Sequence, residues 1–376
     1  MPLPESRNGE SLEFHSRLNV YDESTIGDPE QYIWSSIKLW GVLDYADFRL
    51  EELHRVSNKR SREAIAKNLK LYIGQAFELY QAAGSAKANT APLLYYYSYL
   101  NLAKALCEIR NPRLHKLPES YRHGISWRPS KDYLVNMRTE SVSVISRGVW
   151  HVLYEALTQQ PCRVPNPCKL SIDALFGLNP EIGLEYEGTF DRLPSLIELH
   201  HPDILVDYDQ ENVWIRFSVD REELKDLNLT RPKLLKSVTA SGSTYHQVRS
   251  VDPDLWTFEL EKPKKVPTEC MESPEEVLTA EVNAMNLFVY LDHEGLKYMV
   301  PIQSRLPIRL PQLLVLYSLM FWLGSLVRYD PHSVAELQES EYWLLIDGFI
   351  SQSRLWLLEL FEWELFKAEI ILRAAR

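Results

Sequence analysis

The chain is poor in the features that mark secreted and membrane proteins. Its four cysteines, Cys107, Cys162, Cys168 and Cys270, form no CxxC pair, which favours a reducing compartment over a disulfide framework. No charged segment followed by an apolar run opens the chain, so we expect no signal peptide. The most apolar stretch, residues 313–327, is shorter than the ~20 residues that span a bilayer. These absences predict a cytoplasmic protein that makes no membrane contact.

The common cofactor and hydrolase motifs are also missing. The sequence has no GxxxxGK[ST], GxGxxG, GxSxG or HExxH pattern, so we expect no nucleotide cofactor and no serine-hydrolase elbow. His200 and His201 precede Asp203 and Asp207, but no metal-binding motif frames them. We therefore expect neither a cofactor nor a metal site.

What is present is the composition of a folded protein. Of 376 residues, 45% are apolar and 25% are charged, which excludes a disordered tail and a collagen-like fibre. The length predicts two domains, or one domain with a large insertion. A chain of this size buries a substantial core without disulfides or metals.

The net charge of −11 conceals a basic window. Residues 54–128 carry thirteen basic and four acidic side chains, a net charge of +9. Such a window fits a surface for phosphate or an acidic partner, and the alternative is a solvated helical face that docks on the chain's own acidic segments. The candidate nucleic-acid-binding residues are Lys59, Arg60, Arg62, Lys67, Lys70, Arg113, Lys116 and Arg122.

Periodicity predicts a mainly helical chain with strands in its middle. Apolar spacings of three and four indicate a helix over residues 61–83 and a second over 93–109, with Pro92 in its first turn, as an antiparallel pair. Alternation indicates strands within 203–262 and a hairpin over 287–302. Other expected elements are helices over 30–41, 149–157, 171–176, 311–327 and 342–376, a hairpin over 132–145 and a linker over 263–280.

These elements predict an α+β fold, mainly helical, in four parts. The parts are an irregular N-terminal arm (1–30), a helical segment (31–130), a mixed β-containing middle region (131–300) and C-terminal helices that pack back on the N-terminal helices (301–376). No internal repeat or low-complexity run interrupts them.

Three segments together resemble the YaaC-like family of bacterial proteins. They are residues 75–109, the His123–Gly124 pair in SYRHGIS, and residues 311–331, PQLLVLYSLMFWLGSLVRYDP. They lie towards both ends of the chain, so the resemblance covers most of it and is weakest in the middle. The resemblance implies no particular activity.

The helical pair is also similar to HEPN domains, which are small helical bundles. The similarity rests on a helix with the pattern YYxxxxxxAKAL, followed by a basic turn and a histidine. Many HEPN domains are metal-independent RNases of toxins and phage-defence systems, and others bind nucleotides or partners. The resemblance implies a HEPN-like bundle formed by the N- and C-terminal helices, and a homodimer in which two copies share one cleft.

The HEPN signature is an arginine, often followed by a polar residue, with a histidine four to six positions beyond the arginine. Arg110, Asn111 and His115 match it, whereas Pro112 departs from it because proline disfavours continuation of the helix. A histidine moves protons near neutral pH, and an arginine fork binds the phosphate. The hypothesis is a metal-independent RNase or toxin/phage-defence effector that uses Arg110, Asn111 and His115, with His123 as a further catalytic candidate.

Several alternatives remain open. Arg110 and His115 also suit a helix C-terminus, where cations are favoured, and Arg49 to His54 has the same spacing. Three weaker candidates are His123 beside Arg122, the run from Arg328 to His332, and the tyrosines of YYYSY at 95–99, which could stack bases or simply pack. The alternative function is a non-catalytic nucleic-acid- or protein-binding subunit of a larger bacterial complex. The expected partners are RNA and either a second copy or a partner protein.

Overall fold

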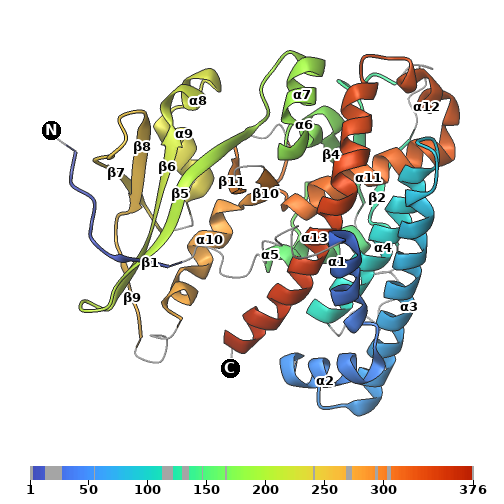
Figure 1. The fold of residues 1–376 in the computed structure, drawn as a ribbon, viewed down its shortest axis with the longest axis horizontal. Coiled ribbons are helices and arrows are strands. Elements are labelled where there is room, and N and C mark those ends of the chain that lie inside the picture. The colour runs from blue at the N-terminus through green and yellow to red at the C-terminus, as the bar shows by residue number, and fades with distance from the viewer. Residues whose placement is uncertain are drawn as a thin grey trace. The chain divides into compact units, whose positions relative to one another are not determined.

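A computed structural model describes most of the chain. The described residues are 3–12, 28–54, 56–111, 122–128, 135–145, 147–165, 167–239, 242–267, 273–292, 295–302 and 306–374. The fold is α+β and mainly helical, as predicted (Figure 1). The chain divides into a sheet unit, residues 1–18 and 193–304, and a helical unit, residues 19–192 and 305–376.

The sheet unit is built on an antiparallel sheet in the order β10-β11-β5-β6-β8-β7, with β1 beside β5 and β9 beside β6. Its strands are β1 (Glu10–Leu12), β5 (Leu196–Asp207), β6 (Asn212–Asp220), β7 (Tyr245–Val248), β8 (Leu255–Leu260), β9 (Lys264–Lys265), β10 (Phe288–Asp292) and β11 (Gly295–Pro301). Its helices are α8 (Arg221–Asp226), α9 (Arg231–Val238), η5 (Pro274–Leu278) and α10 (Thr279–Met285). The predicted hairpin over 287–302 is confirmed, with Phe288 paired to Met299.

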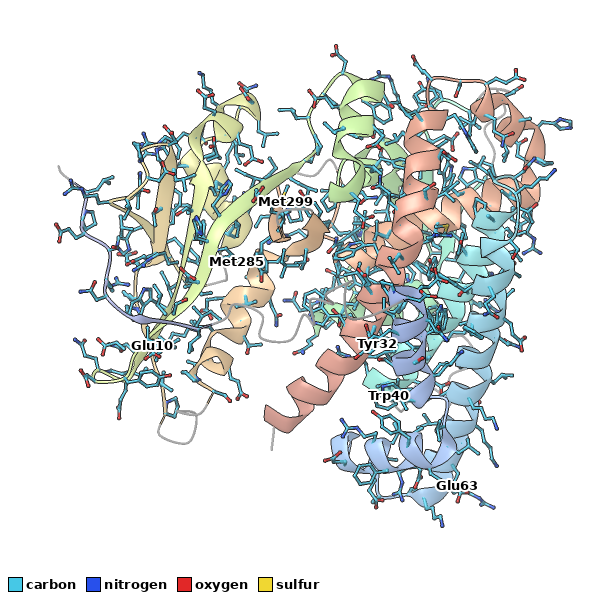
Figure 2. The ribbon with its side chains drawn as sticks, in the orientation of Figure 1. Glu10, Tyr32, Trp40, Glu63, Met285 and Met299 are labelled. Atoms are coloured by element: carbon cyan, nitrogen blue, oxygen red, sulfur yellow. The ribbon has the colours of Figure 1, made fainter. Side chains whose placement is uncertain are left out.

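Alternating residues of β6 form the core of this unit. Val213, Ile215 and Phe217 lie on one face of the strand and belong to the same buried cluster as Leu234 of α9 and Met285 of α10. Figure 2 labels Met285. The short helices α8 and α9 between β6 and β7 were not predicted, because six and eight residues give too little periodicity.

Residues 3–12, predicted to be irregular, are fixed to the sheet. Strand β1 pairs with β5 through Glu10 and Val206. The guanidinium of Arg7 donates to the carbonyl of Leu260 at 2.8 Å, and its backbone N–H donates to Glu259 at 3.2 Å. The predicted arm also includes Pro29, the first residue of helix α1. Part of the arm is therefore ordered by partners far along the sequence, which local patterns do not reveal.

The helical unit is a bundle joined to a small sheet. Its helices are α1 (Pro29–Leu39), α2 (Leu43–His54), α3 (Lys59–Gly84), α4 (Ala91–Arg110), α5 (Val149–Thr158), α6 (Ile172–Phe176), η3 (Pro180–Ile182), α7 (Gly183–Phe190), α11 (Gln312–Tyr329), α12 (Pro331–Gln338) and α13 (Trp343–Ala374). The strands β2 (Ile125–Ser126), β3 (Ser141–Val144) and β4 (Cys168–Ser171) form an antiparallel sheet in the order β2-β3-β4. Residues 131–192 were predicted to belong to the β-containing middle region, whereas the structure places them in this helical unit.

Helix α4 is the centre of the bundle. It contacts α3, α5, α11 and α13, and Tyr99, Ala103 and Leu106 on it are fully or almost fully buried. Pro92 occupies its first turn, and Asn111 caps its C-terminus, so the predicted bounds are nearly correct. The predicted antiparallel partner is α3, whose Ala76 carbonyl accepts a hydrogen bond from Ser98 at 2.7 Å.

Helix α2 was not predicted. It carries alternating acidic and apolar residues with little amphipathic pattern, and it is held by contact with α3. Trp40, labelled in Figure 2, lies just after α1, is fully buried, and its ring centroid is 5.6 Å from that of Tyr45 on α2. Tertiary packing thus fixes an element that the local sequence does not mark.

Helix α11 is the apolar stretch that the sequence predicted to be a core helix. It is the one helix in the described part of the chain that is long and apolar enough to cross a membrane, and 83% of it is buried inside the protein. Leu316, Tyr317 and Trp322 on it are fully buried. This burial supports the core-helix interpretation, and the cytoplasmic location stays a prediction.

Candidate functional site

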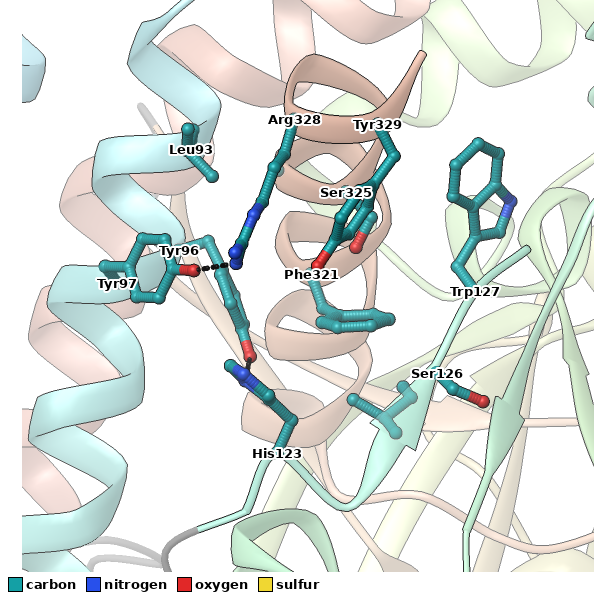
Figure 3. Close-up of a pocket in the computed structure, with 12 residues that line it drawn as sticks. Leu93, Tyr96, Tyr97, His123, Ser126, Trp127, Phe321, Ser325, Arg328 and Tyr329 are labelled. Atoms are coloured by element: carbon teal, nitrogen blue, oxygen red, sulfur yellow. Dashed lines mark hydrogen bonds between the residues drawn. The ribbon is translucent and has the colours of Figure 1, made fainter. Parts of the chain in front are cut away.

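A pocket of about 410 Å³ opens in the helical unit where α4, α11 and the segment around β2 meet (Figure 3). Its size is within the range of small-molecule sites. The lining residues are Leu93, Tyr96, Tyr97, His123, Ile125, Ser126, Trp127, Phe321, Gly324, Ser325, Arg328 and Tyr329. Three candidates that the sequence analysis treated separately, His123, Arg328 and the tyrosine run, therefore line one cavity.

The helices that frame the pocket approach each other at Gly324. A Cβ atom on Gly324 would lie 3.0 Å from the Cβ of Tyr96 and 3.4 Å from the carbonyl oxygen of Pro92. The first two turns of α4 therefore lie directly against the last turns of α11. This approach brings Arg328, near the end of α11, beside Tyr97 of α4.

The backbone of His123 is held by the start of helix α5. The first two amides of that helix, from Val149 and Trp150, donate to the carbonyls of Arg122 at 2.7 Å and of His123 at 3.1 Å. These amides have no partner within their own helix, so the two carbonyls cap it. Gly124, at φ +78°, and Gly148, at φ +143°, permit the close approach.

The imidazole of His123 is oriented by Tyr96. The Tyr96 hydroxyl and Nδ1 of His123 share a hydrogen bond, whose direction depends on the tautomer of the ring. Nε2 makes no hydrogen bond to a residue that the structure describes. Burial lowers the pKa of His123, and the nearby charges of Lys104 and Arg328 lower it further. The ring is therefore neutral at physiological pH, with one nitrogen available for a ligand.

Arg328 is the cation of the pocket. Its Nη1 donates to the Tyr97 hydroxyl at 2.5 Å, and its guanidinium carbon is 5.0 Å from the ring centroid of Tyr329. Among the described residues no carboxylate pairs with it. The nearest acid in sequence, Asp330, caps helix α12 by accepting from the backbone and hydroxyl of Ser333 at 3.2 and 2.7 Å. The positive charge of Arg328 is therefore uncompensated by those residues.

The walls of the pocket are aromatic. Tyr96, Tyr97, Trp127, Phe321 and Tyr329 contribute rings, and no described aspartate or glutamate lines the cavity. The indole of Trp127 is fixed by donating from Nε1 to the buried carboxylate of Glu140 at 2.8 Å. An uncompensated guanidinium beside several rings suits a ligand that combines an anion with a planar group.

The predicted catalytic residues are not all brought to this pocket. Arg110 donates through Nη2 to the carboxylate and the carbonyl of Glu364, both at 2.8 Å, with 9% of its side chain exposed. Asn111 caps α4, and its backbone N–H donates to the Cys107 carbonyl. His115 lies outside the described residues, so the motif of these three stays a prediction. His123 does line the pocket.

The candidate nucleic-acid-binding residues are placed differently from one another. Lys59, Arg60, Lys67 and Lys70 are exposed along α3, and Arg122 is exposed next to His123. Arg62 is buried: its guanidinium pairs with Asp47 at 3.0 Å and Glu51 at 3.1 Å, which holds α2 against α3. Arg113 and Lys116 lie outside the described residues. Arg62 is thus committed to packing, and the exposed cations stay candidates.

Metal ligands do not gather anywhere in the described part of the chain. No group of three or more histidine, cysteine or acidic side chains there could hold an ion. His200 of the sheet unit instead lies 3.7 Å from Glu198, within β5.

These observations define a mainly helical α+β protein with a cationic, aromatic pocket. A family model described as YaaC-like protein matches residues 43–365, most of the chain. The protein belongs to the YaaC-like family, as the three sequence segments indicated. No curated protein and no solved structure matches the chain.

Proposed function

We propose that the pocket between α4 and α11 binds a nucleotide of single-stranded RNA. The observation that carries the proposal is the guanidinium of Arg328, which has no carboxylate partner among the described residues and lies beside aromatic rings in a cavity that no described carboxylate lines. Arginine binds phosphate through two parallel hydrogen bonds, and exposed aromatic rings stack on bases of any sequence. A nucleotide combines these two groups at a separation that one pocket accommodates.

RNA cleavage without a metal is the reaction that we assign to this site. With its ring hydrogen on Nδ1, towards Tyr96, neutral His123 offers the Nε2 lone pair to a ribose 2′-hydroxyl. His123 takes the hydroxyl proton, the 2′-oxygen attacks the adjacent phosphorus, and the 5′-oxygen leaves and takes a proton from water. The products are a 2′,3′-cyclic phosphate and a 5′-hydroxyl. Arg328 stabilises the negative charge that grows on the phosphate oxygens.

This assignment differs in residues, but not in chemistry, from the HEPN-like hypothesis. Arg110 already binds Glu364, whereas Arg328 has no carboxylate partner in the described part of the chain. We therefore favour His123 and Arg328 over Arg110 and His115. The HEPN-like bundle, the shared cleft of a homodimer and a role in phage defence remain proposals that rest on the resemblance of the α4 sequence.

The second candidate function is binding without catalysis, as a subunit of a complex. The exposed cations of α3, among them Arg60, Lys67 and Lys70, favour it, since they suit an RNA backbone or an acidic partner. The aromatic helix α13 does not favour it: Phe349, Trp356 and Phe361 are buried in the bundle and are not available to a partner.

The decisive experiment is cleavage of an unstructured oligoribonucleotide in EDTA by the wild type, His123→Asn and His332→Asn. Asparagine keeps a hydrogen-bonding group near Tyr96 but moves no proton, and His332 is an exposed histidine of α12 that does not line this pocket. We expect cleavage by the wild type and His332→Asn, and a rate at least ~100-fold lower for His123→Asn. Binding without cleavage by the wild type would establish the second candidate. Equal cleavage by all three would exclude His123, and His115→Ala would be tested next.

A further inference from the structure

A second cation lies near His123, outside the pocket lining. Lys104 is on α4, seven residues beyond Tyr97, so the two side chains share a face of the helix about 10 Å apart along its axis. Its Nζ is 5.6 Å from the ring centroid of Tyr72 on α3. Lys104 and Arg328 both lie near enough to His123 to act on its pKa. His123 therefore interacts electrostatically with two cations that lie on different helices.

Lys104 is half-buried and has no carboxylate partner among the described residues. Its half-burial removes part of the hydration of the ammonium and thereby lowers its pKa. Glu108, one turn further along α4, accepts two hydrogen bonds from Asn68, at 3.0 and 3.3 Å, instead. A partly dehydrated ammonium that no described carboxylate neutralises is a strong site for an anion, because the anion restores the lost interactions.

The separation of the two cations determines which kind of ligand binds both of them. Arg328 donates a hydrogen bond to Tyr97, and Lys104 lies two helical turns beyond Tyr97 on α4. That span exceeds one phosphate group. A base in the aromatic pocket with one phosphate on each side of its ribose reaches both.

We propose that Lys104 is a second phosphate-binding residue, so that the site takes a nucleotide with phosphates at both its 5′ and 3′ positions. The inference rests on the proposed nucleotide-binding function and narrows its ligand. Phosphates at both positions are present in an internal nucleotide of an RNA strand and in a free nucleoside 3′,5′-bisphosphate. Because the 2′-oxygen attacks the 3′-phosphate, Arg328 binds the 3′-phosphate and Lys104 the 5′-phosphate. A nucleoside 3′-monophosphate has only the group that Arg328 binds.

Calorimetric titration of three ligands tests the assignment: adenosine 3′-monophosphate, adenosine 3′,5′-bisphosphate and a short oligoadenylate with 2′-O-methyl groups, which cannot be cleaved. The proteins are the wild type, Lys104→Met, which keeps the apolar stem, Arg328→Ala, and the control Lys169→Met, which removes an exposed charge from β4. We expect Lys104→Met to weaken bisphosphate binding about tenfold or more, the size of a charged hydrogen bond, and to change monophosphate binding less than twofold. Arg328→Ala weakens both, and Lys169→Met changes neither.

Each outcome has a distinct meaning. If the wild type binds the ligands and Lys104→Met leaves bisphosphate affinity unchanged, or lowers both affinities equally, the role of Lys104 is wrong and the pocket function stands. If the wild type binds none of the three, the pocket function itself is wrong. A bisphosphate that binds far more tightly than the oligoadenylate identifies the free nucleotide as the source, and the reverse identifies the strand.

Discussion

A Cβ atom on Gly148 would lie 2.4 Å from the backbone nitrogen of Gly124, closer than any real Cβ contact. The two glycines hold the segment that carries His123 in backbone contact with the start of α5. The pocket thus depends on a pair of residues that contribute no side chain to it.

Gly148→Ala is expected to destabilise the helical unit and to disrupt the pocket. The added methyl group clashes with backbone atoms that cannot rotate away, and φ at Gly148 is +143°, so a loss of about 3 kcal/mol or more follows. The matched control is Gly74→Ala on α3, where no atom lies within 4 Å of the new Cβ. This control should be stabilised by roughly 0.5–1 kcal/mol. Urea unfolding of both variants measures the difference, and equal stabilities would contradict the account of the glycine pair.

Arg110→Met is expected to cost about 3–5 kcal/mol of folding free energy, because it removes a buried guanidinium that donates to both the carboxylate and the carbonyl of Glu364. The double variant Arg110→Met, Glu364→Leu removes both charges and should recover most of that loss. Denaturant unfolding of the single and double variants checks this. RNA cleavage by a folded double variant would show that Arg110 acts in packing, whereas a folded but inactive one would support the Arg110 motif.

The pH dependence of cleavage should follow His123. As a general base it must be deprotonated, so the rate rises with pH up to its pKa and is flat above it. Burial and two cations place that pKa below 6.5, so the plateau includes neutral pH. Arg328→Ala and Lys104→Met each remove a nearby positive charge and should move the His123 pKa upwards, as followed by NMR of the ring protons. An unmoved titration in both variants would show that the cations do not act on His123.

Stability should fall as the pH rises from about 4.5 to about 8, because of Glu181. Burial raises the pKa of Glu181 to about 8 and that of neighbouring Glu359 to about 7, so the folded protein keeps protons that the unfolded chain loses. The free energy of unfolding therefore falls across this window, by an amount on the order of 4 kcal/mol for Glu181. Glu181→Gln, which cannot ionise, should be less sensitive to pH. Exposed Glu187→Gln on α7 is the control, and thermal melts at pH 5 and pH 8 compare them.

RNA affinity should depend on salt through Arg328. Each cation that binds a phosphate of a single strand adds about 0.7 to the slope of log K against log salt. Arg328→Ala should reduce the slope by about this amount. Arg138→Ala, which removes an exposed arginine that lies over the ring of Phe190, should leave it unchanged. Equal slopes for all proteins would place the phosphate elsewhere. Filter-binding titrations between 50 and 200 mM salt, the range over which such slopes are resolved, suffice.

The extent to which the sequence predicted the structure depends on the range of the interactions. Helices α3, α4 and α11 were predictable because each repeats apolar residues at three and four, or is apolar throughout. Strand β1 was not, because its hydrogen-bonding partners in β5 lie far along the chain. The sequence indicated His123, the tyrosine run that contains Tyr96, and Arg328 as three separate features. Their meeting depends on the crossing of α4 and α11 at Gly324, which no local pattern encodes.

The hydrogen bond between Arg7 and Glu259 joins two residues that the ribosome makes at very different times. The two residues are 252 positions apart, and a ribosome adds about 5–20 residues per second. Glu259 is therefore synthesised roughly 10–50 s after Arg7. Within that interval α3 and α4 are synthesised first, then β5 and β6, and Glu259 in β8 comes last. The contacts between α3 and α4 are local and form early, whereas the N-terminal segment that contains Arg7 docks only after β8 has been made.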